Sequence, residues 1–216
     1  VLSFARPRAR RVESIDLSER VRCLEGMIGR VLGDDVDLDL DLESDHDAPP
    51  SAARTADPGF VHIDPAHLER ALLNLASNAR ASLEGRREPA RFRISTRRVL
   101  IDRDGRDGEA PQSAPICGVS EGWHLRLTAR DNGCGMGPAL TRRIFEPFFT
   151  TRGQTGGTGL GLATIEEVVR ESRGGIRVES APGEGTAFHL YFPISSAASA
   201  RKPVGAPRLD LRAAGV

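Results

Sequence analysis

The sequence predicts an α/β fold built as a two-layer sandwich, in which helices pack against a β-sheet. Segments with the 3.6-residue period of a helix alternate along the chain with segments that have the two-residue period of a strand. The last two strands are separated only by the short turn of residues 181–185, which favours antiparallel pairing between them. The 216 residues fit one ordinary domain with tails, or two very small domains, and no internal repeat is present.

Three helices are predicted where apolar residues recur at every third or fourth position. They cover residues 17–31, 65–83 and 160–172. Asp16 precedes the first helix, and Asp64 is a suitable N-cap for the second, with Pro65 in its first turn. Two consecutive glycines after residue 173 are expected to end the third helix.

Strands are predicted where apolar and polar residues alternate. They cover residues 36–42, 60–63, 91–101, 123–131, 176–180 and 186–193. The first of these, VDLDLDL, is typical of a half-buried strand with a solvated outer face. Two stretches rich in Gly, Pro, Asp and Ser, 43–59 and 102–122, are predicted to be loops. We expect the second to be a solvent-exposed loop within one domain, not a domain boundary.

Charge and cysteine content narrow the possible functions. Lys and Arg total 30 and Asp and Glu total 30, so no positive excess indicates nucleic-acid or membrane binding. The three cysteines are far apart and form no C-x-x-C pair, which favours a reducing compartment over disulfides or a zinc site. No apolar run of about 18 residues and no signal-peptide pattern occurs, so we expect a cytoplasmic location. Because the sequence does not begin with Met, we also expect it to be a piece of a longer protein.

Asn74 and Asn78 lie one turn apart on the second predicted helix, at the edge of its apolar stripe. That stripe is formed by Leu68, Leu72, Leu75, Ala79 and Leu83. Asn is a mediocre helix former because its amide competes for backbone groups, so two on one side suggest a function. Their carbonyl oxygens could hold a hard cation such as Mg²⁺, which bridges nucleotide phosphates. The alternative is a solvated polar edge of the helix.

Asp131 ends a predicted strand and is followed by Gly133 and Gly135. Glycines allow left-handed backbone angles and the close approach of a ligand. A carboxylate at a strand end can accept a hydrogen bond from the exocyclic amine of adenine, whereas the carbonyl group of guanine would not satisfy it. The alternative is an ordinary Asp-Asn-Gly turn.

An aromatic segment precedes a glycine-rich helix start. Three of the eight Phe fall within five residues, where we expect Ile144, Phe145, Phe148 and Phe149 to pack around Pro147. Gly157, Gly159 and Gly161 then alternate into the first turn of a helix, and Thr158 adds a hydroxyl donor. Because a helix start offers free N–H groups and partial positive charge, phosphates are its natural ligand. A local hydrophobic staple and a flexible connector are the alternatives.

Taken in order, these motifs resemble the ATP-binding catalytic domain of sensor histidine kinases, within the superfamily of gyrase, heat-shock and mismatch-repair ATPases. ERALLNLASNA resembles the N box, DNGCGM the first glycine box, IFEPFFT the phenylalanine box and GGTGLGLA the second glycine box. GEGTAF resembles a further glycine and threonine segment, and VLSFAR the end of a dimerisation helix. The resemblance implies the Bergerat fold, a mixed β-sheet covered on one face by helices. It divides the chain into a linker (1–14), the catalytic domain (15–194) and a flexible C-terminal linker (195–216).

The resemblance also implies ligands and site residues. Asn78 would hold Mg²⁺ with Asn74 beside it, and Asp131 would bind the adenine of ATP. The other nucleotide-binding positions that it implies are Gly133, Gly135, Thr150, Thr151, Gly157, Thr158, Gly159, Leu160, Gly161 and Thr186. Residues 150–157 would form a lid over ATP, and Arg152 is expected to reach the γ-phosphate as a catalytic residue. Replacing Gly159 and Gly161 with Ala is expected to abolish ATP binding and to leave the fold intact.

Three departures from the family pattern shape the predicted activity. Hydrolytic members carry a Glu at the position of Asn74, and without that base hydrolysis should be slow, so transfer to a protein is favoured. Ala81 stands where many members carry a Lys or Arg, and Arg80 points elsewhere on the helix. No His of the chain has the sequence context of a phosphoacceptor. The resemblance therefore implies a homodimeric kinase whose phosphoacceptor domain is absent here and whose partner is a response regulator. An ATP-sensing module and a stand-alone ATPase are the alternatives.

Overall fold

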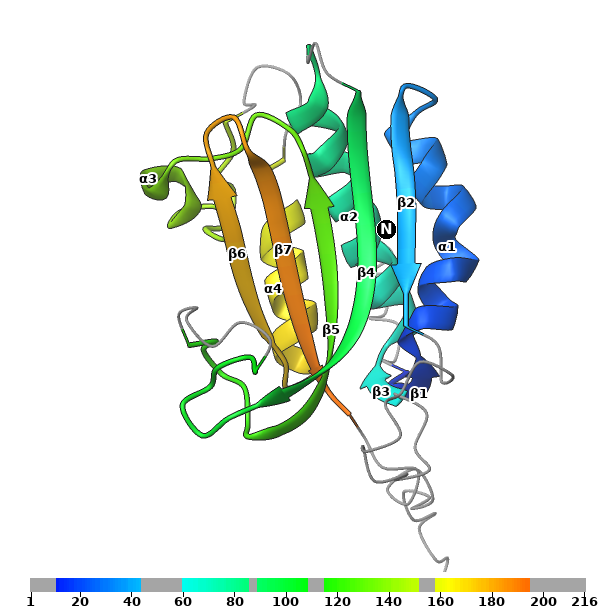
Figure 1. Ribbon diagram of the computed structural model, residues 1–216, viewed down its shortest axis with the longest axis vertical. Coiled ribbons are helices and arrows are strands. Elements are labelled where there is room, and N and C mark those ends of the chain that lie inside the picture. The colour runs from blue at the N-terminus through cyan, green and yellow to red at the C-terminus, as the bar shows by residue number, and fades with distance from the viewer. Residues whose placement is uncertain (1–10, 44–59, 86–88, 109–114, 152–157, 195–216) are drawn as a thin grey trace, which may run out of the picture.

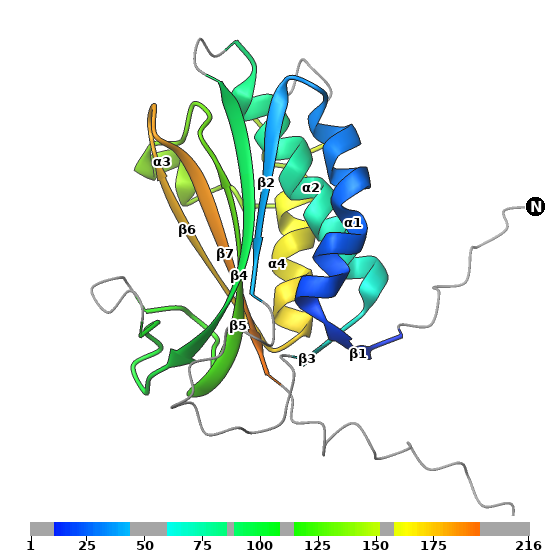
Figure 2. The same cartoon turned by 45° about the vertical axis from the view of Figure 1, so that its right-hand side comes forward.

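The computed structural model describes residues 11–43, 60–85, 89–108, 115–151 and 158–194. These residues form two layers, a five-stranded sheet and a layer of helices (Figure 1). Figure 2 shows that the three long helices all lie on one face of the sheet. The predicted two-layer α/β sandwich is thereby confirmed.

The helices are α1 (Leu17–Leu32), α2 (Pro65–Leu83), α3 (Pro138–Thr141) and α4 (Gly161–Glu171). The strands are β1 (Glu13–Asp16), β2 (Val36–Leu42), β3 (Phe60–Ile63), β4 (Ala90–Ile101), β5 (Gly122–Asp131), β6 (Gly175–Ala181) and β7 (Gly185–Pro193). All three predicted helices and all six predicted strands are present. Strand β1 and helix α3 were not predicted, because each has four residues and is too short to show a period.

The large sheet has the strand order β2-β4-β5-β7-β6. Strand β2 pairs with β4 in parallel, and the other neighbours are antiparallel, so the sheet is mixed. The pairing of β5 with β7 places Asp131 opposite Thr186, which brings two predicted site residues together. Strands β1 and β3 form a separate antiparallel pair, and β1 straddles the predicted boundary between linker and catalytic domain.

The core lies between the helices and the inner face of the sheet. The five residues of the predicted stripe on α2 are all buried, at 5% exposure or less. The helix begins where expected, because the Asp64 carboxylate accepts a hydrogen bond from the N–H of Ala66 at 2.9 Å. Helices α2 and α4 run side by side in opposite directions, with Asn74 against Gly161 at one end and His67 against Glu171 at the other.

The segment after β4 corrects one prediction. We expected a solvent-exposed loop, but in its described parts, 102–108 and 115–121, Asp107 is fully buried and Ile116 is 4% exposed. Ile116 joins Val99, Ile101 and Tyr191 in a second apolar cluster on the outer face of the sheet. The segment was predicted to be exposed because it is rich in Gly and Pro, and the few apolar residues that anchor it show no periodic pattern.

The buried carboxylate of Asp107 lies against this outer cluster and contacts Tyr191. Its Oδ2 atom accepts hydrogen bonds from Nη1 of Arg126 at 2.6 Å and from the hydroxyl of Tyr191 at 3.1 Å. Burial raises the pKa of the Tyr191 phenol well above its ordinary value, so the hydroxyl remains a donor. Because a buried carboxylate is tolerated only when it is paired, these contacts fix the segment on the sheet.

His124 lies on β5 and is 1% exposed. Its Nδ1 atom lies 3.0 Å from the carbonyl oxygen of Gly122, so Nδ1 carries the proton that is donated. Its Nε2 atom is buried and has no hydrogen-bond partner within the described ranges. Burial lowers the pKa of His124 below its usual 6.5, and the hydrogen bond to Gly122 opposes this only in part. Burial also lowers the pKa of His189, which Glu179 partly opposes.

The stability of the protein is therefore expected to fall as pH drops below about 6.5. The unfolded chain takes up a proton on His124 near this pH, whereas the folded chain resists protonation until the lowered pKa is reached. Each such histidine changes the free energy of unfolding by at most about 1.4 kcal/mol per pH unit. Urea unfolding at about pH 7.5 and about pH 5.5 measures the effect.

His124→Asn is the matched variant for this measurement. The Asn amide can keep the hydrogen bond to Gly122 but takes up no proton, so the pH dependence between these two values should shrink. An unchanged pH dependence in the variant would show that His124 is not one of its causes.

Candidate functional site

The predicted site residues come from four segments that meet at one end of the sheet. These are the second half of α2, the loop after β5, the start of β7 and the start of α4 (Figure 1); the described Thr150 and Thr151 follow α3. The N–H of Cys134 donates to the carbonyl of Ser82 at 2.9 Å, and the N–H of Gly183 donates to the carbonyl of Cys134 at 2.7 Å. The loop after β5 is thus held between α2 and the β6–β7 turn.

The two asparagines of α2 have different environments. The Nδ2 atom of Asn74 donates to the carbonyl oxygen of Gly161 at 3.2 Å, which ties α2 to the first residue of α4. The Nδ2 atom of Asn78 is buried and has no hydrogen-bond partner among the residues that the structure describes. A buried amide nitrogen without a partner is a polar group that a bound ligand or water can satisfy. Rotation of the amide by 180° exchanges its nitrogen and oxygen, so Asn78 can present an oxygen to a cation.

The basic side chain two residues after Asn78 is paired at the β2 edge of the sheet. Nη1 of Arg80 forms an ion pair with Oδ1 of Asp35, which lies before β2. The hydrogen bond from Arg80 lowers the pKa of the Asp35 carboxyl below its usual value. The expectation that Arg80 points elsewhere is confirmed, and Ala81 offers no charge in its place.

Asp131 is a buried carboxylate with 6% exposure. Its Oδ1 atom lies 2.8 Å from the backbone nitrogen of Gly133 and 2.9 Å from Oγ of Ser82, and both groups can donate to it. The N–H of Gly133 lies two residues after Asp131, so this hydrogen bond is that of an Asp-Asn-Gly turn, and the contact of Asp131 with a base stays a prediction. Since an ionised carboxylate has about four acceptor positions, two donors on Oδ1 leave capacity for a further donor from a ligand.

The glycines of the DNGCGM segment are explained by packing. A Cβ atom at Gly133 would lie 2.1 Å from Oγ of Ser82. Gly135 has a φ of +64°, and a Cβ atom there would lie 1.9 Å from the carbonyl oxygen of Ala181. These glycines let the loop approach both α2 and the β6–β7 turn. Their predicted contact with a base remains a prediction.

Two serines of the site were missed in the sequence analysis. Ser180 lies opposite Thr186 in the sheet, and their hydroxyl oxygens are 2.9 Å apart. Oγ of Ser180 also accepts a hydrogen bond from the N–H of Met136 at 2.8 Å, so it links the glycine loop to Thr186. Ser82 follows Asn78 by four residues, and extending the spacing of the two asparagines by one more turn would have identified it.

The helix start at α4 is partly described. The N–H of Phe148 donates to the carbonyl of Gly159 at 3.0 Å, which joins the two ends of the segment that contains the predicted lid. Leu160 precedes α4, and no side chain caps the helix there in the described part of the chain. Thr158 and Leu160 are exposed. The uncapped N–H groups in the first turn of α4, together with the helix dipole, suit an anionic ligand.

Four further predicted residues belong to the stretch 150–157 that precedes this helix start in the sequence. Thr150 is half-buried and Thr151 is exposed at the beginning of the predicted lid. Arg152 and Gly157 lie outside the described residues.

The expected packing of the aromatic segment is wrong at one position. Ile144 is buried, Phe145 packs against the core, and the ring of Phe149 lies 4.2 Å from the guanidinium carbon of Arg143. Phe148 is instead 75% exposed, with a φ of +66°. Its backbone turns to reach Gly159, and this turn directs the ring away from the core.

Gly159→Ala and Gly161→Ala, both expected to leave the fold intact, differ in the space available for the added Cβ atom. Gly159 has a φ of +65°, and a Cβ atom there would lie 2.4 Å from the carbonyl carbon of Phe148. Ala at this position would disturb the backbone, so the expectation is wrong for Gly159. At Gly161 the nearest atom to a Cβ would be Cγ of Asn74 at 3.6 Å, an ordinary contact. Only Gly161→Ala tests the phosphate site without a direct clash.

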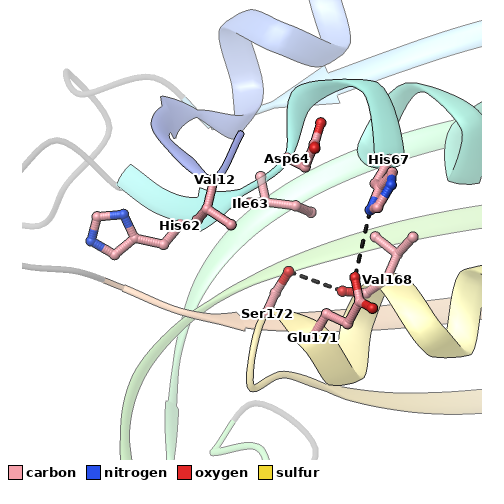
Figure 3. Close-up of a pocket in the computed structure, with 8 residues that line it drawn as sticks. All are labelled: Val12, His62, Ile63, Asp64, His67, Val168, Glu171 and Ser172. Atoms are coloured by element: carbon pink, nitrogen blue, oxygen red, sulfur yellow. Dashed lines mark hydrogen bonds and ion pairs between the residues drawn. The ribbon is translucent and has the colours of Figure 1, made fainter. Parts of the chain in front are cut away.

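A small pocket lies at the other end of α2 and α4 (Figure 3). His67 Nδ1 lies 3.5 Å from Oε2 of Glu171, which pairs the start of α2 with the end of α4. His62 points away from this pair, and the pocket contains none of the site residues predicted from the sequence. The described residues contain no group of three or more His, Cys, Asp or Glu that could hold a metal ion.

The structure is an α/β domain with a cluster of buried and half-buried polar side chains at one end of a mixed sheet. Residues 63–196 match the family described as histidine kinase-, DNA gyrase B- and HSP90-like ATPases. The chain belongs to this family, whose members bind ATP, and the predicted Bergerat fold is confirmed.

Similar proteins are sensor kinases. The chain is 28% identical to sensor kinase CckA of Brucella abortus over 195 residues, which are 89% of this chain and 18% of that protein. It is 29% identical to the signal transduction histidine-protein kinase AtoS of Escherichia coli, over 90% of this chain and 26% of that protein. The chain thus spans at most about a quarter of these relatives.

A solved structure of the mycobacterial sensor histidine kinase MprB aligns with a TM-score of 0.57 and 25% identity, over 86% of this chain and 99% of that one. The resemblance to sensor histidine kinase catalytic domains is confirmed. In the described part of the chain, no helix has both the length and the apolar character needed to cross a membrane. The cytoplasmic location and the domain boundaries stay predictions.

Proposed function

We propose that this chain binds ATP with Mg²⁺ and transfers the γ-phosphoryl group to a histidine of a separate dimerisation domain. Two neighbouring features support this most. The buried carboxylate of Asp131 accepts two hydrogen bonds, and the buried amide nitrogen of Asn78 has no hydrogen-bond partner among the described residues. The start of α4 lies beside them, tied to α2 through Asn74. Asp131 suits the amine of a base, Asn78 suits a cation, and the start of α4 suits a phosphate chain.

Each residue has a distinct task in this proposal. Asp131 accepts a hydrogen bond from the adenine amine and orients the base. Asn78 would hold Mg²⁺ through its amide oxygen, and the ion would supply positive charge that neutralises the phosphates. The backbone N–H groups at the start of α4 hold phosphate oxygens. Thr150, Thr151 and Arg152 belong to the proposed lid, with Arg152 directed at the γ-phosphate.

Transfer is favoured over hydrolysis by the contact of Asn74. A hydrolytic mechanism needs a base that takes a proton from water. Asn74 has no titratable group, and its Nδ2 already donates to the carbonyl of Gly161. In phosphoryl transfer most of the rate enhancement comes from positioning and charge neutralisation, which the described groups can supply.

The proposal includes partners that the chain itself lacks. The acceptor histidine would lie on a dimerisation domain, so the complete protein would act as a homodimer and would later pass the phosphoryl group to an Asp of a response regulator. Phe148 and Leu160 are exposed apolar side chains, 75% and 43% exposed, on either side of Gly159. They offer a contact surface at the point where an acceptor helix would approach ATP.

The test mixes this chain with a separate phosphoacceptor-helix protein and ATP labelled on its γ-phosphate. We expect acid-labile histidine phosphate on the acceptor, and a strong loss of it with Asn78→Ala. Protection of residues 150–157 from protease by ATP without any phosphorylation would instead support an ATP-sensing module. Steady turnover faster than about one ATP per second would support a stand-alone ATPase.

A further inference from the structure

Ser82 is in direct contact with the carboxylate proposed to bind adenine. It lies in the last turn of α2, half-buried, with Oγ 2.9 Å from Oδ1 of Asp131 and 3.0 Å from the carbonyl oxygen of Ala79. A hydroxyl has one hydrogen, so it can donate to only one of these two oxygens. A charged oxygen at 2.9 Å requires a hydrogen between the two atoms, and therefore the hydroxyl donates to Asp131.

The position of Ser82 is fixed by its surroundings. Its carbonyl oxygen accepts a hydrogen bond from the N–H of Cys134 at 2.9 Å. A Cβ atom at Gly133 would lie 2.1 Å from Oγ of Ser82, so Gly133 leaves the space that the hydroxyl occupies. The end of α2 and the glycine loop are thus built around this one side chain.

We propose that Ser82 is a positioning residue that gives the site its preference for adenine. Together with the N–H of Gly133, its hydroxyl holds Oδ1 of Asp131 from two directions. The plane of the carboxylate is thereby fixed, and its remaining acceptor capacity is directed at a purine amine. This inference rests on the proposed function, because it assumes that Asp131 faces the base.

A role of Ser82 in base recognition affects the affinity for ATP and for a nucleotide without the amine differently, whereas a role in stability affects both alike. Without the Ser82 hydroxyl, Oδ1 loses one of the two hydrogen bonds described above, and the carboxylate is held less firmly in the orientation that faces the amine. ATP affinity should then fall about tenfold, the value of one hydrogen bond to a charged group. A nucleotide that lacks the amine gains nothing from the oriented carboxylate, so its affinity should change little.

The experiment measures dissociation constants of ATP and inosine triphosphate, which has a carbonyl group in place of the amine. We expect Ser82→Ala to lower the ratio of ATP to inosine triphosphate affinity about tenfold. Ser82→Thr keeps a hydroxyl and should restore most of the ratio. Ser172→Ala is the matched control, since Oγ of Ser172 donates to the Val168 carbonyl at 2.9 Å, at the far end of α4 from the predicted site (Figure 3).

The possible outcomes separate the two proposals. If the wild-type chain does not bind ATP, the proposed function fails. If the wild-type chain prefers ATP and Ser82→Ala keeps the same preference, the role of Ser82 is refuted and the proposed function survives. Equal losses for both nucleotides would show a merely structural role and would also overturn the inference.

Discussion

Replacing Asp131 with Asn is expected to reverse the preference of the site for ATP over GTP. In the wild type, the N–H of Gly133 and the hydroxyl of Ser82 both point at Oδ1 of residue 131. In the variant, only the amide oxygen can meet these two donors, so the amide NH₂ must take the position of Oδ2. That NH₂ would face the adenine amine, donor against donor, but it would match the carbonyl group of guanine.

The effect should be large because the site is buried. Asp131 is 6% exposed, so unmatched donors there are not rescued by solvent. We expect the ratio of ATP to GTP affinity to fall on the order of 10³-fold, since sites that recognise a polar group strongly reject its mismatch. Calorimetric titration with both nucleotides measures the ratio, and circular dichroism checks the fold. A folded variant that still prefers ATP would contradict the assignment of Asp131 to the base.

Gly135→Ala is expected to destabilise the domain by about 3 kcal/mol or more. Gly135 has a φ of +64°, and an added Cβ would lie 1.9 Å from the carbonyl oxygen of Ala181. The same atom would lie 3.0 Å from the carbonyl oxygen of Gly185, so the backbone has no direction in which to yield. The loop after β5 would be pushed off the β6–β7 turn, and nucleotide binding should be lost with it.

Gly137→Ala is the matched control, two residues later in the same loop. Gly137 has a φ of −78°, and the nearest atom to an added Cβ would be Cγ of Pro182 at 4.0 Å. Its cost should be at most about 1 kcal/mol. Urea unfolding of both variants gives the two free energies of unfolding. Equal values for Gly135→Ala and Gly137→Ala would contradict the close packing described here.

The regular elements could be predicted because their signals are local. The stripe on α2, the cap at Asp64 and the alternation of β2 each lie within a few consecutive residues. Asn78 and Asp131 could also be singled out, since each stands in a short motif with a chemical reason for its residue type. Their meeting at one end of the sheet depends on the strand order, which no local pattern of the sequence reveals.

The features that escaped prediction depend on contacts between distant segments. Ser82 becomes part of the site only because Asp131, 49 positions later, turns toward it. Phe148 is exposed because its N–H bonds Gly159, across the segment that contains the predicted lid. Burial of Ile116 depends on the outer face of the sheet, which no local period reveals. In each case the determining partner is not a sequence neighbour.

The hydrogen bond between Phe148 and Gly159 has a consequence for the thermodynamics of ligand exchange. It joins the two ends of residues 149–158, so these residues form a closed loop. The entropy of bringing the loop ends together is spent when the domain folds, and nucleotide binding need not supply it again. A ligand that contacts residues between these two ends would therefore not have to supply the free energy of closing the loop.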